Sequence, residues 1–300
     1  MEIEVLVNQR YQCGEGPHWD HANNRLIFND ISGKSVTVVD LETKEAKRVD
    51  GMPDTVSAVV PRASNKDEVV ICHGQNLEIL NLETKQREII AIVDEGTENI
   101  LNDAKCDPVG RLWAGTMGPE ASPGNVDPEK GSVFCLDKDR KISKKFDKVN
   151  IANGLAWSLD QKTFYYIDSL PRKVDAFDYD VATGEIKNRR TAIDVKKFED
   201  FAHITDGMCI DEEGMLWIAL FNGGKVIRCN PNTGEKLSEI LLPVKQTTSC
   251  CFAGPNLDQL IVTSASSLSE EELKQQPEAG FVFRIKNVGV RGVQAVSYAG

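Results

Sequence analysis

Short apolar runs alternate with turn residues along the whole chain. Representative runs are 25–28, 111–114 and 215–219, and each follows a turn rich in Asp, Asn, Pro or Gly. These turn residues between apolar runs mark tight turns that connect β-strands. Long helical periodicity is nearly absent, except at 269–274, where Ser269 precedes three Glu residues as in a helix N-terminus. The pattern therefore predicts an all-β chain with one short helix.

The strand pattern repeats six times. A polar residue opens an apolar segment at Glu15, Ser57, Asn102, Asn153, Asp206 and Thr248, at intervals of 42, 45, 51, 53 and 42 residues. Repeats of about 40–50 residues are typical of propeller blades. The sequence thus predicts a six-bladed β-propeller, with residues 1–300 forming a single domain. The strand-like segment 5–7 is expected to complete the sixth blade, because closure of the ring removes exposed strand edges.

The composition of the chain indicates which classes of binding partner and which cellular location to expect. The chain has 35 basic and 46 acidic residues, a net charge of −11, and eight cysteines without a CxxC pair. Nucleic-acid binding is disfavoured, because phosphate backbones require clustered Lys and Arg. The chain shows neither a signal peptide nor an apolar run long enough to cross a bilayer. We expect a cytoplasmic protein with free thiols that binds neither nucleic acid nor membrane, with the oligomeric state open and a monomer compatible.

Four of the six repeats begin with an oxygen-bearing side chain suited to a metal ion. The innermost strand of each propeller blade lines the central channel, so Glu15, Asn102, Asn153 and Asp206 are expected around one mouth. Two carboxylates and two carboxamides suit Ca²⁺ or another divalent ion, and a cation would relieve the repulsion between Glu15 and Asp206. A single Asp-Gly or Asn-Gly pair more often forms a turn. Its recurrence at the blade spacing favours a metal site.

These motifs carry a family resemblance. The segments concerned are 14–19, 102–111, 114–117, 153–158, 165–169 and 206–211. Together they resemble the SMP-30/gluconolactonase/luciferin-regenerating-enzyme family, also called regucalcins, from residue 13 to the C-terminus. The resemblance implies a six-bladed propeller with one divalent metal ion near the axis, and it implies relatives that include metal-dependent lactonases.

The resemblance also assigns individual residues. It implies that Glu15, Asn153 and Asp206 bind the metal, in agreement with the repeat pattern, and that Asn102 and Glu120 contact substrate. Glu120 lies in 119–130, a Gly-, Pro- and acid-rich segment for which we expect a flexible loop able to cover the site. Sugar-lactone-hydrolysing relatives carry Arg at the position of Ile100. The apolar residue favours a less polar substrate, because a fork of hydrogen-bond donors is lost.

The sequence leaves alternative functions. The first is a metal-dependent hydrolase of small lactones or esters, with the metal as Lewis acid and Asp206 as a candidate base. The second is a calcium- or ligand-binding regulatory propeller with little or no turnover. A WD-type interaction propeller is weaker, because WD dipeptides do not recur at the blade spacing. Ca²⁺ is the first choice of cofactor, and Zn²⁺, Mn²⁺ and Mg²⁺ remain compatible.

Overall fold

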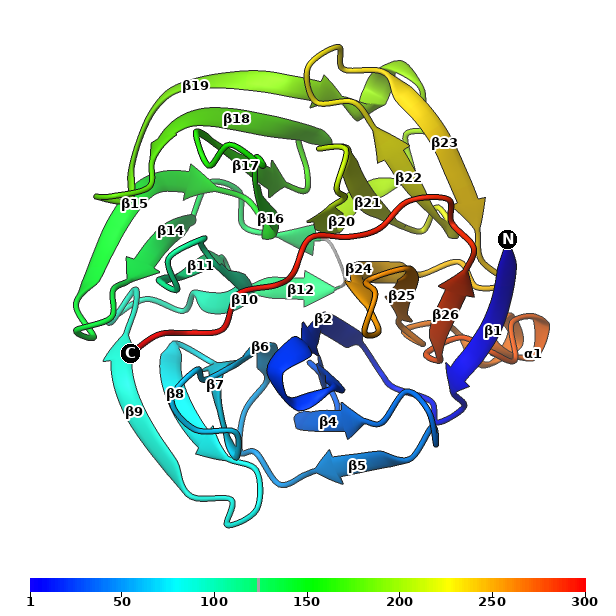
Figure 1. Ribbon diagram of the computed structural model, residues 1–300, viewed down its shortest axis with the longest axis horizontal. Coiled ribbons are helices and arrows are strands. Elements are labelled where there is room, and N and C mark those ends of the chain that lie inside the picture. Colours follow the sequence, from blue (N-terminus) through cyan, green and yellow to red (C-terminus); the bar gives the residue numbers. More distant parts are fainter. Residues whose placement is uncertain (123–124) are drawn as a thin grey trace.

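The computed structural model describes residues 1–122 and 125–300. Six four-stranded antiparallel sheets stand in a ring around a central axis (Figure 1). The predicted all-β, six-bladed propeller is therefore confirmed. None of the helices in the described part of the chain is long and apolar enough to span a membrane.

Five blades are continuous in sequence. Blade 1 contains β2 (Gly14–Asp20), β3 (Arg25–Asp30), β4 (Ser35–Val39) and β5 (Ala46–Val49). Blade 2 contains β6 (Val56–Pro61), β7 (Glu68–His73), β8 (Asn76–Asn81) and β9 (Arg87–Ile92). Blade 3 contains β10 (Ile100–Cys106), β11 (Leu112–Met117), β14 (Gly131–Leu136) and β15 (Ile142–Val149). Blade 4 contains β16 (Ala152–Trp157), β17 (Thr163–Asp168), β18 (Lys173–Asp180) and β19 (Glu185–Asp194). Blade 5 contains β20 (Ile204–Ile210), β21 (Leu216–Phe221), β22 (Lys225–Cys229) and β23 (Lys236–Leu241).

The sixth blade joins the two ends of the chain. It contains β24 (Thr247–Ala253), β25 (Gln259–Ser264), β26 (Val282–Lys286) and, as its outer strand, β1 (Glu2–Val7). Ile3 pairs with Ile285 and Val5 pairs with Phe283. The expectation that the N-terminal residues complete this blade is confirmed.

Outside the six blades, the described segments 1–122 and 125–300 contain three short helical elements and one hairpin. The predicted helix is present as α1 (Glu270–Gln275). Its N-terminus has a capping box, in which the side chains of Ser269 and Glu272 each accept the backbone N–H of the other residue. Two 3₁₀ turns, η1 (His21–Asn23) and η2 (Val195–Lys197), lie in connections. The strands β12 (Glu120–Ser122) and β13 (Asn125–Val126) form a separate hairpin between β11 and β14.

The apolar core is divided among the six gaps between neighbouring blades. Each cluster of buried side chains combines residues of two adjacent blades, including the pair formed by blades 6 and 1. Leu112 packs toward blade 2, whereas its neighbour Trp113 packs toward blade 4, because successive side chains point to opposite faces of a strand. Both faces of each blade are therefore buried. This explains why the strand sequences are continuous apolar runs and do not alternate between apolar and polar residues.

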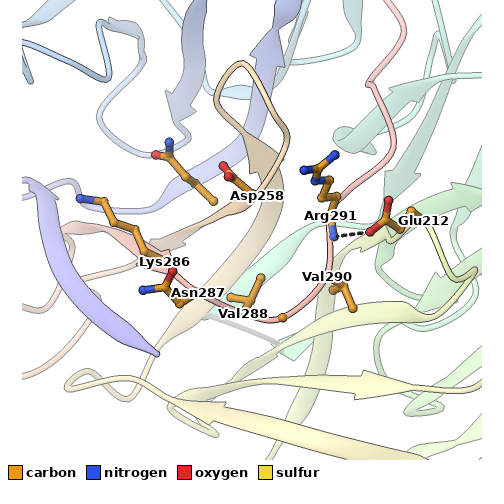
Figure 2. Close-up of a pocket in the computed structure, with 9 residues that line it drawn as sticks. Glu212, Asp258, Lys286, Asn287, Val288, Val290 and Arg291 are labelled. Atoms are coloured by element: carbon orange, nitrogen blue, oxygen red, sulfur yellow. Dashed lines mark hydrogen bonds between the residues drawn. The ribbon is translucent and has the colours of Figure 1, made fainter.

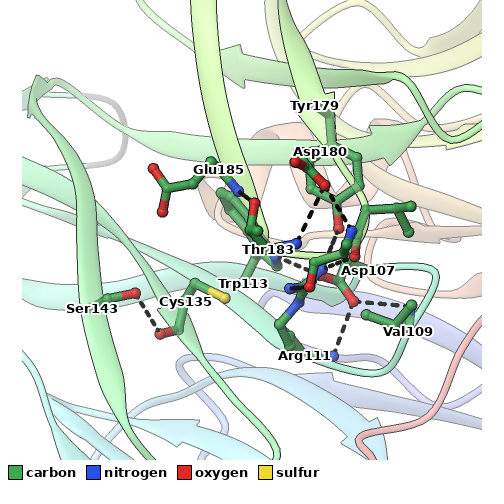
Figure 3. A network of polar contacts seen from close by, with 12 residues as sticks. Asp107, Val109, Arg111, Trp113, Cys135, Ser143, Tyr179, Asp180, Thr183 and Glu185 are labelled. Atoms are coloured by element: carbon green, nitrogen blue, oxygen red, sulfur yellow. Dashed lines mark hydrogen bonds and ion pairs between the residues drawn. The ribbon is translucent and has the colours of Figure 1, made fainter.

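A buried aspartate fixes the turn that follows some of the inner strands. Asp107 is fully buried and accepts hydrogen bonds from the backbone and guanidinium of Arg111, from the indole of Trp113 at 3.1 Å and from the hydroxyl of Tyr179 at 2.7 Å (Figure 3). Asp211 makes the corresponding contacts in blade 5, including one to Trp217 at 2.9 Å. These two carboxylates are saturated by the protein and hold the fold together.

The C-terminal residues 287–300 cross the ring on the face where the inner strands end (Figure 1). Arg291 donates its backbone N–H to Glu212 at 3.1 Å at one side of the ring (Figure 2). On the other side Tyr298 is fully buried, and its backbone N–H donates to the carbonyl of Pro61 at 2.9 Å. The segment is thus fastened at both sides of the channel.

Candidate metal centre

Every inner strand contains a β-bulge near its beginning. The register shifts fall at 15–18, 56–58, 101–104, 153–155, 205–208 and 247–250. A bulge opposes two residues of one strand to one residue of its partner and re-aims side chains. The repeated polar residues lie in strands at these bulges rather than in turns. The bulges thus account for their orientation around one mouth of the channel.

Three of the expected residues come together. Glu15 on β2 and Asn153 on β16 are both buried, and Asp206 on β20 keeps partial contact with solvent. The side chains of Glu15 and Asn153 both lie within hydrogen-bonding reach of the Asp206 carboxylate. The inner strands of blades 1, 4 and 5 therefore place two carboxylates and one carboxamide in direct proximity.

The two carboxyl groups are strongly perturbed. Burial raises the pKa of Glu15 to about 8, and the negative charge of Asp103 adds to this effect. Burial also raises the pKa of Asp206 well above its usual range, and Glu15 and Asp103 contribute to the increase. Desolvation dominates even for the partly accessible Asp206, because protein atoms surround the carboxylate closely. A set of buried acids that resists ionisation is the environment that a bound cation would stabilise.

Backbone N–H groups hold the carboxylates in place. The N–H of Gly16 donates to Glu15 Oε2 at 2.6 Å, and the N–H of Gly207 hydrogen-bonds the Asp206 carboxylate. Glycine at position 207 also allows close approach of the next blade, since an added Cβ would lie 2.0 Å from the Oγ of Ser249. The glycine that follows the acid therefore serves the packing of neighbouring inner strands.

Hydrogen bonds also orient the two carboxamides. Nδ2 of Asn153 donates to Oγ of Ser169 at 2.9 Å, and Nδ2 of Asn102 donates to the carbonyl of Ala152 at 2.8 Å. In each case the amide nitrogen is engaged by the protein. The amide oxygen then remains available as an acceptor or a metal ligand.

Asp103 is a site residue to which sequence reasoning assigned no role. It is buried, accepts the N–H of Ala104 at 2.7 Å, and its charge raises the pKa of both Glu15 and Asp206. A regular strand would send Asp103 to the face opposite Asn102. The bulge at 101–104 breaks this alternation, so both residues lie opposite Gly115 of β11. The sequence feature that could have identified Asp103 is its position directly after the repeated residue Asn102.

Glu120 belongs to the same mouth. Burial raises the pKa of the Cys13 thiol, and the negative charges of Glu15, Asp206 and Glu120 add to the increase. The described part of 119–130, the segment expected to form a flexible loop, contains the β12–β13 hairpin. Residues 123–124 of that expected loop lie outside the described residues. Glu120 therefore lies on β12, which pairs with β13. The Gly- and Pro-rich composition of the segment gave no indication of this pairing.

Ile100 lies at the beginning of β10, opposite Met117. It packs against a small apolar cluster formed by Met117, Val126 and Ile151. Met117 ends β11, Val126 lies on β13, and Ile151 directly precedes β16, the strand that carries Asn153. The wall of the mouth beside the two carboxamides is therefore apolar.

His18, His73 and His203 lie apart from Glu15, Asn153 and Asp206. His73 is held by Glu78 at 2.9 Å, and His203 is held by Glu199 at the same distance. His18 is buried further along β2, past the bulge, and lines a cavity with the ends of other inner strands. None of these contacts involves the carboxylates of the mouth.

The residues fit a divalent cation by their chemistry. Carboxylate and carboxamide oxygens are hard ligands of the type that Ca²⁺ takes in proteins. Within the described residues no group of three or more His, Cys, Asp and Glu side chains is arranged to hold a metal ion. A cation at this mouth would therefore depend on the Asn153 amide as its third protein ligand and on water for the rest of its coordination.

Comparison with known proteins places the chain in a family. The family model described as SMP-30/Gluconolactonase/LRE-like region matches residues 13–266. Regucalcin of Macaca fascicularis is 46% identical over 302 aligned residues, covering 100% of this chain and 99% of the relative. A luciferin-regenerating enzyme is 35% identical with a TM-score of 0.92, covering 100% of this chain and 99% of that one. A calcium-binding protein, regucalcin, from Agrobacterium tumefaciens is 25% identical with a TM-score of 0.89, covering 99% and 97%. The chain therefore belongs to the SMP-30/gluconolactonase/LRE-like family.

Proposed function

We propose that this protein is a divalent-metal-dependent hydrolase of small lactones or esters. The observation that carries the proposal is the convergence of Glu15, Asn153 and Asp206 at one mouth of the channel, with raised pKa values for both acids. Membership of a family whose description includes gluconolactonases supports the same activity.

Ca²⁺ is the cation we propose for this centre. The three ligands are oxygen donors without sulfur or imidazole, and Ca²⁺ favours such sets. The Agrobacterium tumefaciens relative is described as a calcium-binding protein. Zn²⁺, Mn²⁺ and Mg²⁺ remain alternatives to be compared. When bound, the cation would supply Lewis-acid polarisation of the ester carbonyl and stabilise negative charge on its oxygen.

The chain's own residues would orient the substrate and move the proton. The Asn102 amide, fixed by the Ala152 carbonyl, offers an oxygen to a substrate hydroxyl. Glu120 on the hairpin is a second proposed contact at the mouth. Asp206 is the proposed base that accepts a proton from the attacking water, because it combines a raised pKa with partial solvent access. The proton later returns to the leaving alkoxide.

The substrate we propose has an apolar body next to its ester or lactone group. Ile100, Met117 and Ile151 form an apolar wall beside Asn102 and Asn153. A ring or chain of carbon atoms would gain free energy by burial against this wall, at roughly 25 cal/mol per Å² of apolar surface. A sugar lactone, by contrast, would leave its hydroxyls without partners there.

Ring opening across a lactone panel tests the proposal. The panel runs from sugar lactones to alkyl and aromatic lactones, each with Ca²⁺, Zn²⁺ or Mn²⁺ and with chelator. We expect metal-dependent turnover, best with an apolar ring and lost in Asp206→Ala. Ile100→Arg is the matched specificity variant, and we expect it to shift preference toward polyhydroxylated lactones. Metal binding without turnover of any lactone would contradict the proposal.

A regulatory calcium- or ligand-binding propeller is the second candidate. Ile100 favours it, because the Arg that sugar-lactone-hydrolysing relatives use is absent. The same panel separates the two candidates. Tight Ca²⁺ binding with no ring opening in any metal would favour the binding protein.

A further inference from the structure

We propose that the opposite mouth of the channel is a second binding site, for a small carboxylic acid with an apolar body. A cavity of about 290 Å³ lies there, near the lower limit of typical small-molecule pockets. The inner strands of five blades line it with residues that follow the repeated polar residue along each strand. Cys209, for example, lies three positions after Asp206, or about 10 Å along an extended strand.

The C-terminal segment roofs this cavity. Val293, Ala295 and Val296 line it from the segment 287–300 that crosses the channel (Figure 1). The backbone of Gly292 donates to Leu257 at 2.7 Å on one side, and the backbone of Tyr298 is bonded to blade 2 on the other. The segment is thus held by hydrogen bonds at both ends, and its middle part covers the cavity in which a ligand could bind.

The lining is mostly apolar, with a single charged side chain. Ala156, Ile210 and Phe252 contribute apolar surface from blades 4, 5 and 6. Among the residues lining the cavity Lys105 alone is charged, and its ammonium group donates to the carbonyl of Met208. No ion pair of Lys105 occurs among the described residues at salt-bridge distance. An ammonium has three donors, so this group can bind an anion beside its carbonyl contact.

Two further side chains of the lining have an unsatisfied ring nitrogen. Nε2 of His18 and Nε1 of Trp157 are buried and have no hydrogen-bond partner in the described protein. Burial lowers the pKa of His18 to about 4, so the ring is neutral at physiological pH and can donate through one nitrogen. Buried polar atoms normally find partners. A ligand carboxylate in contact with Lys105 and these rings would provide acceptors for them.

The chemistry of the lining determines the ligand class. A cation would be repelled by Lys105, and a polyhydroxylated ligand would lose hydrogen bonds to water against the apolar walls. A neutral apolar molecule would leave both ring nitrogens without partners and would offer no acceptor to the donors of the Lys105 ammonium that the Met208 carbonyl does not use. An acid with an apolar chain or ring satisfies both parts of the lining.

Calorimetric titration of the Ca²⁺-saturated full-length protein with octanoate, octan-1-ol and acetate tests the site. We expect saturable 1:1 binding of octanoate, at least tenfold tighter than that of octan-1-ol or acetate. Lys105→Gln should weaken the binding of octanoate at least tenfold while leaving the binding of octan-1-ol unchanged. Lys105→Arg should restore the affinity for octanoate. Lys138→Gln, in an exposed outer turn, is the control for a lost charge.

Variants at the two mouths locate the bound acid. Ala295→Trp should abolish octanoate binding by filling the cavity from the roof, with Val293→Trp as a second such variant if the first unfolds. Asp206→Asn should leave octanoate binding unchanged, because it alters only the metal mouth. Absence of saturable binding would overturn the proposal. So would binding that is lost in Asp206→Asn and retained in both roof variants, which would place the acid at the metal centre.

Discussion

At the scale of single residues, the proposed metal centre is a cluster of acidic side chains that the fold has enclosed. Burial raises the pKa of Glu15, Asp103 and Asp206. The charge of Asp103 adds to the increase at Glu15 and Asp206, and the charge of Glu15 adds to the increase at Asp206. Such a cluster destabilises the metal-free protein wherever the acids are ionised. Its presence at one mouth is understandable if a cation compensates for it.

The first prediction concerns stability and pH. The folded protein keeps the proton of Glu15 up to about pH 8, whereas an unfolded chain loses it near 4.5. Between these values the unfolded state binds fewer protons, so stability falls as pH rises. The melting temperature of chelator-treated wild type should therefore fall between pH 5 and 8 more steeply than that of Glu15→Gln. Added Ca²⁺ should remove most of the difference at pH 8. Identical pH profiles for the two proteins would contradict the assignment.

The second prediction concerns Asp103. We expect Asp103→Asn to weaken Ca²⁺ binding on the order of tenfold, because it removes a nearby charge rather than a ligand. The stoichiometry measured by calorimetry should stay at one ion per chain. Asp139→Asn makes the same change of net charge in an exposed turn and should have no effect. Complete loss of binding in Asp103→Asn would instead identify a direct ligand.

At the scale of elements, the bulged inner strand is the unit from which the site is built. Its occurrence in all six blades explains why the polar residue recurs at the blade spacing. Glu15, Asn102, Asn153 and Asp206 could be selected from the sequence because each combines a ligand-type side chain with that position. The family resemblance then singled out Glu15, Asn153 and Asp206 as the expected metal ligands. Asp103 was missed because strict alternation, which the bulge interrupts, places it on the wrong face. The β12–β13 hairpin was missed because the Gly- and Pro-rich composition of the segment gives no strand pattern, although its two strands pair with each other.

The third prediction follows from the contact between β20 and β24. Gly207→Ala would bring a methyl group to 2.8 Å from the Cα of Ser249, so the two strands have to separate. We expect a loss of stability of about 1–3 kcal/mol from overpacking and weaker Ca²⁺ binding, because Asp206 shifts with its strand. Denaturant unfolding and calorimetry measure the two effects. Combination with Ser249→Gly should restore part of both, and wild-type Ca²⁺ affinity in Gly207→Ala would refute the packing argument.

At the scale of the whole molecule, the ring has two mouths, at each of which we propose a binding site, and it is closed by the pairing of β1 with β26. The sequence predicted blade number and closure because six similar repeats cannot bury their faces except against one another. It did not predict the crossing of the C-terminal segment. That path is fixed by Tyr298, buried in the core between blades 2 and 3, and no repeat pattern includes this residue.

The fourth prediction concerns closure of the ring. Removal of residues 1–8 deletes β1 and exposes the edge of β26, and it removes the buried side chains Leu6 and Val7. At about 1.5–3 kcal/mol for each buried aliphatic side chain, the free energy of unfolding should fall by about 3–6 kcal/mol. Removal of residues 1–2 alone should change it little. An unchanged unfolding midpoint for the longer deletion would show that closure does not depend on β1.

The central claim, that three inner strands hold one divalent cation, is tested most directly by calorimetric titration of chelator-treated protein with Ca²⁺. The titration is carried out near pH 7 in buffers of different ionisation enthalpy, with Asp206→Asn in parallel. We predict one site per chain, release of protons on binding because Glu15 is protonated below about pH 8, and loss of the site in the variant. Binding without proton release, or with equal affinity in Asp206→Asn, would contradict the account.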